Sequence, residues 1–481
     1  DHLLLSTPSD QLPDKLYGQL RQAQSPDEQT AILNRFKDYE SYLIDADHIL
    51  RRNTDFFFLS HRLSRLADLV CEAAFSLAWD QLASRYGTPR TAGGVVAPYA
   101  VFGLGKLGGS ALGFASDIEL LCVYSDHGIT DQGTTNREFF ERLVKTATGM
   151  IHAPREGIFR VDLRLRPYGL DGPLAVHLES FISYFGAGGP AHSVERLALI
   201  RLRHIAGDAA LGARVVAIRD QLVYESNAIR VSEIREFRFR QIQAKGSGEA
   251  INVKFSPGAL VDLEYNVQLL QIQQGRTNPG LRDPGIHATL RGLSQAGQID
   301  GAEAESMVRA YRFFRNLING LRMLRGNAQD LVLPRYDTLE FMHLARRMGY
   351  VDAESLTAAD RLRLDCETET AKVRSFIERH LGEEALPEEM VGSPADLVLS
   401  QTVSEARAAT ALRDAGFRDP DRGVVNLRRL AGHGGDSELF ARLIVLAWEY
   451  LRSGTDPDMA LNNWERFTEK VADQNELYRR L

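Results

Sequence analysis

Cysteines are scarce in this sequence of 481 residues, which contains three of them. Cys71, Cys122 and Cys366 lie far apart and form no CxxC pair, so neither a disulfide framework nor a cysteine zinc site is indicated. The histidines include no HxxxH or HxH pair, and we assign none of them to a metal. Because each cysteine stands in an apolar or helical context, we expect all three to be small buried residues.

Long apolar runs and an excess of basic residues are also missing. The longest apolar runs, such as residues 441–448, fall far short of the ~18–20 residues that span a bilayer, which argues against a membrane protein. Lys and Arg number 57 and Asp and Glu 64, giving a net charge of −7. Nucleic-acid binders need a basic surface, so this balance argues against nucleic acid as a partner. No signal peptide is recognisable, and the expected location is cytoplasmic.

Changes in hydrophobic pattern divide the chain into four expected parts. These are an N-terminal helical segment, a compact α/β core, a helical bundle and a C-terminal helical linker, at residues 1–86, 87–230, 231–390 and 391–481. Within the core, the pattern predicts strands at 95–104, 118–124 and 159–165 and a helix at 136–152. The expected fold class is therefore α+β and predominantly helical.

A glycine-rich turn leads into a strand that carries two acids. The turn, Gly103-Leu-Gly-Lys-Leu-Gly-Gly-Ser110, allows backbone amides to crowd an anion. Asp117 and Glu119 are two residues apart at the next strand, so both carboxylates project from one face of it. Two like charges so close are unfavourable unless a cation lies between them. Oxygen ligands beside a phosphate-binding turn suit Mg²⁺.

A third acid stands in the later segment Val161-Asp162-Leu-Arg164-Leu-Arg166. Alternation along a strand would put Asp162, Arg164 and Arg166 on one face, where the acid completes a metal site and the guanidiniums hold phosphate oxygens. Together these residues indicate phosphoryl or nucleotidyl transfer with two metal ions. The plainer alternative stays open: Asp117 and Glu119 form an edge-strand pair, and Asp162 and Arg164 a surface ion pair.

These motifs resemble the nucleotidyltransferase superfamily of polymerase-β type, in which a Gly-Ser turn precedes Asp-x-Asp/Glu and a single Asp follows. The longer run at residues 103–121 is similar to that of bacterial glutamine synthetase adenylyltransferases, bifunctional enzymes that add AMP to glutamine synthetase and remove it. Further ordered matches follow at 160–167, 172–174, 195–208 and 254–268. The chain departs from the family where Glu119 replaces the more common second Asp.

The resemblance implies a polymerase-β-like nucleotidyltransferase core followed by a helical bundle. Residues 416–461 resemble the linker between the two homologous halves of the family's longer enzymes, so we expect the chain to be the half nearer the N-terminus. That half removes AMP by phosphorolysis with inorganic phosphate, and the other half adds it from ATP. Removal is therefore the expected activity, with addition as the other direction.

The resemblance also implies roles for single residues. Asp117, Glu119 and Asp162 would be the catalytic residues and the ligands of Mg²⁺, with a two-metal site expected. The phosphates of ATP, ADP or inorganic phosphate would contact Lys106, Gly108, Gly109, Ser110, Ser116, Arg164 and Arg166. A second polar cluster, which either supports this site or fixes a domain junction through ion pairs, consists of Lys254, Asp262 and Glu264.

The implied partners are glutamine synthetase and, as a further candidate, a PII signalling protein. Two other functions stay open. One is a catalytically silent helical regulator that binds glutamine synthetase or PII, and the intact acids argue against it. The other is a nucleotidyltransferase with a different acceptor, such as RNA or a small molecule, and the acidic charge balance argues against RNA.

Overall fold

The computed structural model describes residues 5–50, 55–153, 159–246, 250–327, 329–353, 356–381, 393–400, 405–432, 436–471 and 473–480. Two compact units make up the chain. The first consists of Asp1–Phe237, Val267–Gly301 and Arg325–Asp330, and the second of Arg238–Asn266, Ala302–Leu324 and Leu331–Leu481. Within the described ranges, every helix is too short or too polar to cross a bilayer. The predicted class, α+β and predominantly helical, is confirmed.

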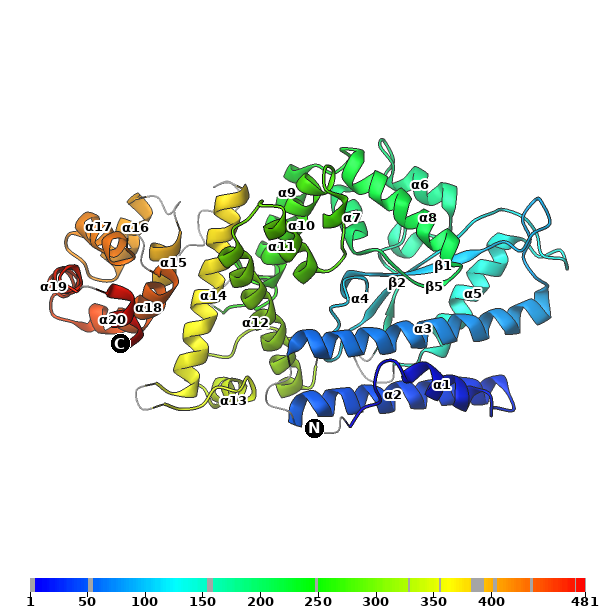
Figure 1. Cartoon of the computed structure of the whole chain (residues 1–481), viewed down its shortest axis with the longest axis horizontal. Coiled ribbons are helices and arrows are strands. Elements are labelled where there is room, and N and C mark those ends of the chain that lie inside the picture. The colour runs from blue at the N-terminus through cyan, green and yellow to red at the C-terminus, as the bar shows by residue number, and fades with distance from the viewer. Residues whose placement is uncertain are drawn as a thin grey trace. The chain divides into compact units, whose positions relative to one another are not determined.

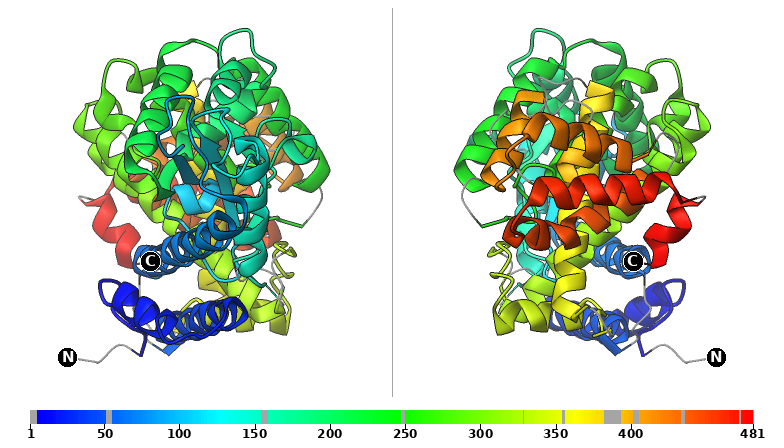
Figure 2. Two further views of the ribbon diagram at one scale, coloured as in Figure 1. Left: turned by 90° about the vertical axis from the view of Figure 1, so that its right-hand side faces the viewer. Right: turned by 90° about the vertical axis from the view of Figure 1, so that its left-hand side faces the viewer.

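Three helices open the first unit. They are α1 (Leu12–Leu20), α2 (Pro26–Leu50) and α3 (Phe56–Tyr86). Helix α3 starts at the N-cap Asp55, whose side chain accepts a hydrogen bond from the backbone N–H of Phe57. In Figures 1 and 2, α3 lies between the sheet and α2, and α1 packs against α2. Helix α3 therefore buries side chains toward both neighbours, which explains why its apolar residues are not confined to a single stripe.

Five short strands form one mixed sheet in the first unit. They are β1 (Tyr99–Leu104), β2 (Ile118–Tyr124), β3 (Val161–Asp162), β4 (Ala175–His177) and β5 (Arg203–Gly207). Strand β1 runs antiparallel between β2 and β5. Strands β3 and β4 both pair in parallel with β2, β3 at its first residues and β4 at its last. The two ends of β2 therefore have different neighbours along the same edge.

The other elements of the first unit surround this sheet. They are α4 (Gly105–Gly108), α5 (Asn136–Met150), η1 (Gly169–Asp171), α6 (Leu178–Phe185), α7 (Ser193–Ala198), η2 (Leu199–Arg201), α8 (Ala209–Asp220), η3 (Gln221–Glu225), η4 (Pro279–Leu281) and α11 (Ile286–Gln295). Helix α5 confirms the helix predicted at 136–152, and β2 confirms the strand predicted at 118–124. The third predicted strand, at 159–165, is wrong in length, because β3 ends at Asp162.

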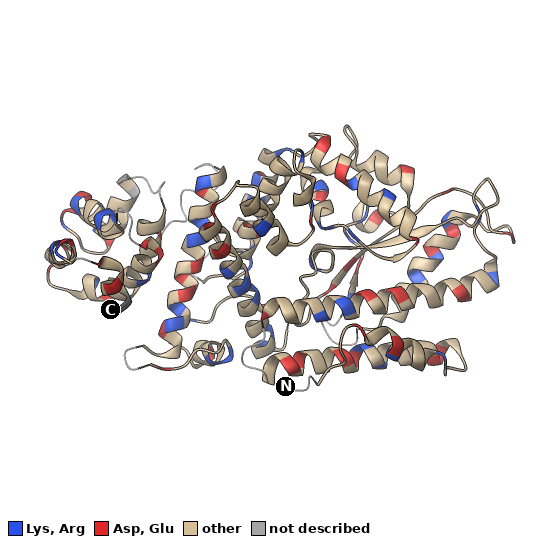
Figure 3. Ribbon diagram, in the orientation of Figure 1, with Lys and Arg blue, Asp and Glu red and all other residues tan. Residues whose placement is uncertain are grey.

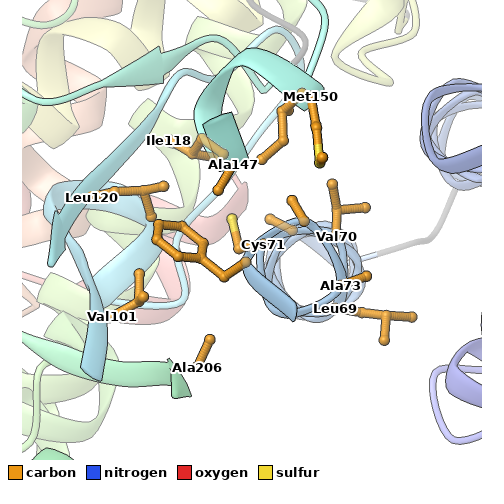
Figure 4. Close-up of a cluster of buried hydrophobic side chains, with 14 of the residues drawn as sticks. Leu69, Val70, Cys71, Ala73, Val101, Ile118, Leu120, Ala147, Met150 and Ala206 are labelled. Carbon is orange, nitrogen blue, oxygen red and sulfur yellow. The ribbon is translucent and has the colours of Figure 1, made fainter. Parts of the chain in front are cut away.

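The main core of the first unit lies between α3, α5 and the sheet. Figure 4 shows Val101, Leu120 and Ala206, from three neighbouring strands, on the side of α3 that carries Cys71. Cys122 of β2 belongs to the same cluster. Cys366 is buried in the second unit, so the prediction that all three thiols are buried is confirmed. Burial raises the pKa of each thiol above its ordinary value.

The second unit is helical. Its helices are α12 (Gly301–Arg325), α13 (Leu339–Arg347), α14 (Ala358–Leu381), α15 (Pro394–Leu399), α16 (Glu405–Asp414), α17 (Pro420–Leu430), α18 (Ser437–Ser453), α19 (Pro457–Glu469) and α20 (Gln474–Arg480), and α9 (Val231–Lys245) and α10 (Leu260–Gly275) contribute residues to both units. Acidic and basic residues are interspersed along α14 (Figure 3). Lys372 of α14 is buried and pairs with both Glu369 and Glu438, with 2.9 Å between the charged atoms in each case.

Candidate active site

Three acids meet at the start of β2. Asp117 and Glu119 flank Ile118, whose side chain is fully buried, so their own side chains project from the opposite face of the strand. Asp162 lies directly opposite Glu119 in the parallel register of β2 and β3. All three side chains are half-buried. Sheet pairing thus brings acids from two distant segments next to one another at the level of the backbone.

Arg164 holds the third acid. Its Nε lies 3.0 and 2.9 Å from the two carboxylate oxygens of Asp162, and its backbone N–H donates to Oδ1 at 2.8 Å. Burial raises the pKa of Asp162, but the hydrogen bonds and charge of Arg164 outweigh burial and leave this pKa below its ordinary value. The bond to Asp162 raises the pKa of Arg164, and the charges of Asp117 and Glu119 add to the effect. Arg164 therefore lies in the field of all three carboxylates.

The glycine turn lies against the second acid. The first two residues of the predicted turn, Gly103 and Leu104, belong to β1, so the turn begins at Gly105. Leu104 is opposite Glu119 in the antiparallel register. Gly105 has a φ of +52°, and a Cβ there would lie 2.8 Å from the carboxyl carbon of Glu119. A glycine at this position therefore leaves the space that the Glu119 carboxylate occupies.

Packing also requires the next glycine of the turn. A Cβ on Gly108 would lie 1.7 Å from the carbonyl oxygen of Arg201, at the end of η2, so Gly108 lets two stretches of backbone touch. Gly109 is less constrained, since its Cβ would lie 3.1 Å from the carbonyl oxygen of Pro284. The structure thus gives Gly108 a packing reason that is independent of any phosphate.

The two serines predicted to bind phosphate differ in exposure. Ser110 is exposed at the end of the turn with a φ of +49°, and its carbonyl accepts a hydrogen bond from the Ser60 hydroxyl at 2.8 Å. Ser116 is 2% exposed, and its hydroxyl oxygen accepts the backbone N–H of Gly113 at 3.0 Å. Ser110 is therefore open to a ligand, whereas Ser116 shapes the loop before the acids. Lys106 lies half-buried in α4.

The prediction that Arg164 and Arg166 share one strand face is wrong, because neither residue lies in a strand. Its buried guanidinium donates to the backbone carbonyls of Leu163, Leu170 and Gly172 at 2.7, 3.0 and 3.1 Å. The strand stops because the Asp162 carboxylate takes up the N–H of Arg164, which turns the chain. Arg166 then closes the loop 163–172 on itself, and this loop follows the third acid.

The ion pair of Arg203 with Asp68, which the motifs did not predict, holds the backbone of the glycine turn in place. Arg203 donates to the carbonyls of Gly108 and Leu107 at 3.1 and 2.9 Å. It also binds both oxygens of Asp68 in α3, at 2.8 and 2.9 Å. One signal for this pair was present in the sequence. Asp68, next to Leu69, and Arg203, next to Leu202, are charged residues at otherwise apolar positions. Arg203 and Asp68 thus position the turn that bears Ser110.

Removing this arginine is expected to destabilise the first unit. In an Arg203→Gln variant the Asp68 carboxylate and two backbone carbonyls lose their donor, which lowers the free energy of unfolding by about 2–3 kcal/mol. The pair of Arg142 and Glu138, whose side chains are 43% and 52% exposed, provides the control, because losing this pair and the bond from Arg142 to the Tyr86 hydroxyl should cost Arg142→Gln about 1 kcal/mol. Urea denaturation measures both. Equal losses in the two variants would contradict the positioning role.

The second polar cluster belongs to the other unit. Asp262 lies in the first turn of α10, is 3% exposed, and accepts from Arg238 Nε at 2.6 Å and from the backbone N–H of Gly258 at 2.7 Å. Glu264 lies 4.0 Å from Arg315. The ammonium of Lys254 sits over the ring of Phe255, 4.9 Å from its centroid. These contacts stabilise the second unit, and a role for the three residues at the active site stays a prediction.

The three acids fit a Mg²⁺ ion in kind, because carboxylate oxygens are its usual protein ligands. Their side chains do not gather at one point. Among the described residues, no group of three or more His, Cys, Asp and Glu side chains is close enough to hold a metal ion. The pairing of Asp162 with Arg164 engages both oxygens of one of the three carboxylates. The donors and their backbone register are therefore suited to a metal, and Asp162 is held by Arg164 in this arrangement.

Comparison with known proteins gives matches along most of the chain. Residues 2–218 match the family model described as Glutamate-ammonia ligase adenylyltransferase, and residues 233–381 match that of GlnD PII-uridylyltransferase. Curated proteins named bifunctional glutamine synthetase adenylyltransferase/adenylyl-removing enzyme are similar. That of Thioalkalivibrio sulfidiphilus is 30% identical over 75% of this chain, and that of Xanthomonas oryzae pv. oryzae is 31% identical over 74%. The matches cover 38% and 37% of the lengths of these two relatives.

Proposed function

Because residues 2–218 form a domain of the Glutamate-ammonia ligase adenylyltransferase family, we propose that this chain regulates glutamine synthetase by transferring AMP. We favour removal: inorganic phosphate attacks the AMP–tyrosine phosphodiester, the bond from phosphorus to the tyrosine oxygen breaks, and ADP and free tyrosine leave. In the other direction, the tyrosine hydroxyl attacks the α-phosphate of ATP and pyrophosphate leaves. The observation that carries the proposal is the register that sets Glu119 opposite Asp162 beside the glycine turn.

The direction rests on a resemblance in sequence. Residues 416–461 resemble the linker that follows the adenylyl-removing half in this family, which supports removal over addition. The relatives carry both activities in their names. The two directions use the same kinds of groups, namely carboxylates, a phosphate-binding turn and a cation, so the site itself supports either of them.

In this proposal, Arg164 and Ser110 are the groups that contact phosphate. The Arg164 side chain is 68% exposed, and its planar fork suits two phosphate oxygens at once. Ser110 is exposed at the end of the turn. A bound phosphate would compete with Asp162 for the same guanidinium, so substrate binding and release of Asp162 are linked.

Mg²⁺ is the metal that we propose for this site, with a second ion as in two-metal nucleotidyl transfer. When bound, the metal would offset the negative charge that develops on the transferred phosphate. Asp117 and Glu119 would hold it, and Asp162 would join them once its ion pair with Arg164 opens. Arg164 meanwhile holds the pKa of Asp162 below its ordinary value and lies in the field of the other two carboxylates.

Removing the guanidinium is therefore expected to strengthen metal binding while it weakens catalysis. In Arg164→Gln, the Kd for Mn²⁺, measured by electron paramagnetic resonance, should fall about threefold, because a competing and largely exposed cation is gone. Release of AMP should decrease in the same variant, since the phosphate loses the guanidinium that would bind two of its oxygens. The exposed Arg142→Gln variant should change neither quantity. An unchanged or higher Kd in Arg164→Gln would contradict the competition between arginine and metal.

One experiment tests the function as a whole. The chain is incubated with adenylylated glutamine synthetase and phosphate, and separately with unmodified glutamine synthetase and ATP. We expect ADP formation in the first mixture. Activity in the second mixture alone would overturn the direction that we favour. Absence of transfer in both would leave the silent regulator as the better description.

A PII protein is the regulatory partner that we propose. The support is the match of residues 233–381 to the GlnD PII-uridylyltransferase family, whose name contains PII. Those residues include α10, α12 and α14, which carry the buried ion pairs of the second unit.

A further inference from the structure

A pocket of about 480 Å³ lies at the end of β2 that is away from the acids. Its aromatic lining consists of Tyr124, His127, Tyr168, His177 and Tyr184. Pockets of about 300–1,000 Å³ commonly hold small organic ligands. Tyr124 is five residues beyond Glu119 on β2, and a rise of ~3.3 Å per residue separates them by roughly 16 Å along the strand. The pocket and the candidate active site are therefore different places on the first unit.

His177 provides an unsatisfied acceptor in this pocket. The residue is 7% exposed, and among the described residues none makes a hydrogen bond to the buried Nδ1 of its ring. Burial, followed by the charge of His127, lowers the pKa of His177, so the ring is neutral near pH 7. In the neutral ring one nitrogen accepts a hydrogen bond, and Nδ1 faces no donor among the described residues.

The rings around this acceptor are arranged as a stacking surface. His127 is exposed and stacks on His177 with 3.7 Å between ring centroids and 22° between planes. Tyr124 meets both imidazoles edge-on, at 6.1 and 5.4 Å. On the loop side, Tyr168 is 60% exposed and packs edge-on against Tyr184. The two exposed rings, His127 and Tyr168, favour a flat ring in the ligand.

Two charged residues complete the lining with opposite signs. Arg137 stands exposed in the first turn of α5, and its guanidinium suits a phosphate group. Glu179 stands exposed in the first turn of α6, and its carboxylate accepts from amino groups, as does Nδ1 of His177. We propose that this pocket binds a nucleotide whose base carries an amino group, as a second nucleotide site separate from the acids of the candidate active site.

One wall of the pocket is connected to Asp162, the third acid, through the loop that follows it. Pro167 and Tyr168 line the pocket and belong to the loop that Arg166 closes, and Pro173, also in the lining, follows that loop directly. The same loop begins just after Asp162, with Arg164 at its start. A ligand that rests on this wall therefore contacts the loop that carries Arg164, the partner of Asp162.

Calorimetric titration of the full chain with AMP in excess EDTA tests the proposal, since EDTA removes binding that depends on a metal. We expect AMP to bind, and UMP, whose base lacks an amino group, to bind at least about fivefold more weakly. His177→Phe keeps a flat ring but removes the acceptor, and Arg137→Gln removes the phosphate partner. Each should raise the Kd for AMP about tenfold or more.

Two further variants separate this pocket from the active site. Asp117→Asn should leave metal-free AMP binding unchanged, and so should Arg142→Gln, which lies on the same helix as Arg137 but not in the pocket lining. Arg137 is exposed and the Arg142 side chain is 43% exposed, so we expect both variants to fold. Absence of AMP binding, equal affinity for UMP, or an unchanged Kd in Arg137→Gln would each overturn the proposal. Because no catalysis is measured, these outcomes are independent of the proposed function.

Discussion

Asp117→Asn is expected to abolish the phosphate-dependent release of AMP from modified glutamine synthetase. Asn keeps the size and shape of the side chain but removes the negative charge, and Asp117 is one of the two acids at the start of β2 that would hold the metal. We expect the rate to fall at least about 100-fold, because even groups that only support a metal ligand contribute about 10–100-fold. The rate is measured as ADP formed from adenylylated enzyme at saturating phosphate.

Two comparisons make this result specific. Glu119→Gln should give a similar loss, since the two carboxylates project from the same face of β2. Asp126→Asn, just beyond the other end of β2, should leave the rate unchanged. Undiminished release in Asp117→Asn, with the fold intact by circular dichroism, would remove the acids from the reaction and the metal site with them.

Gly108→Ala is expected to cause the largest loss of stability of any single-methyl change at the turn. The added Cβ would lie 1.7 Å from the Arg201 carbonyl oxygen and 2.6 Å from that of Gly103, and both are backbone atoms. Neither carbonyl can move away from the new methyl group unless the backbone next to the sheet moves with it. We expect a decrease of about 3 kcal/mol or more in the free energy of unfolding, measured by urea denaturation.

The matched control for this change is Gly149→Ala in α5. A Cβ at Gly149 meets no atom within 4 Å, and alanine favours a helix over glycine by about 0.5–1 kcal/mol, so this variant should be as stable as the parent or slightly more so. A cost below about 1 kcal/mol for Gly108→Ala would mean that the turn adapts easily. Phosphate binding would then be the remaining reason for a glycine at position 108.

The sequence was informative where local rules decide the structure. The apolar run over residues 118–124 predicted β2, and the i, i+2 spacing of Asp117 and Glu119 predicted their common face. The sequence misled at 159–165, where an alternating pattern continues although the chain turns. The Asp162 side chain captures the N–H of Arg164 there, and a side-chain hydrogen bond leaves no trace in a hydrophobic pattern.

Contacts between distant segments were outside the reach of sequence reasoning. Asp68 and Arg203 are 135 positions apart, and nothing local connects them. The same holds for Gly108, which the motif assigned to phosphate and which the fold places against the Arg201 backbone. The pocket at the far end of β2 is built by residues of β2, β4, α5 and α6 and the loop after β3, none of which forms a recognisable motif on its own.

The burial of all three thiols gives the chain a built-in set of reporters. A thiol that is buried and has a raised pKa reacts with alkylating reagents only after the surrounding structure opens. Cys71 and Cys122 sit in the core of the first unit, and Cys366 sits in α14 of the second. Mass spectrometry of the labelled peptides therefore follows the opening of each unit separately, in the unaltered protein and in every variant described above.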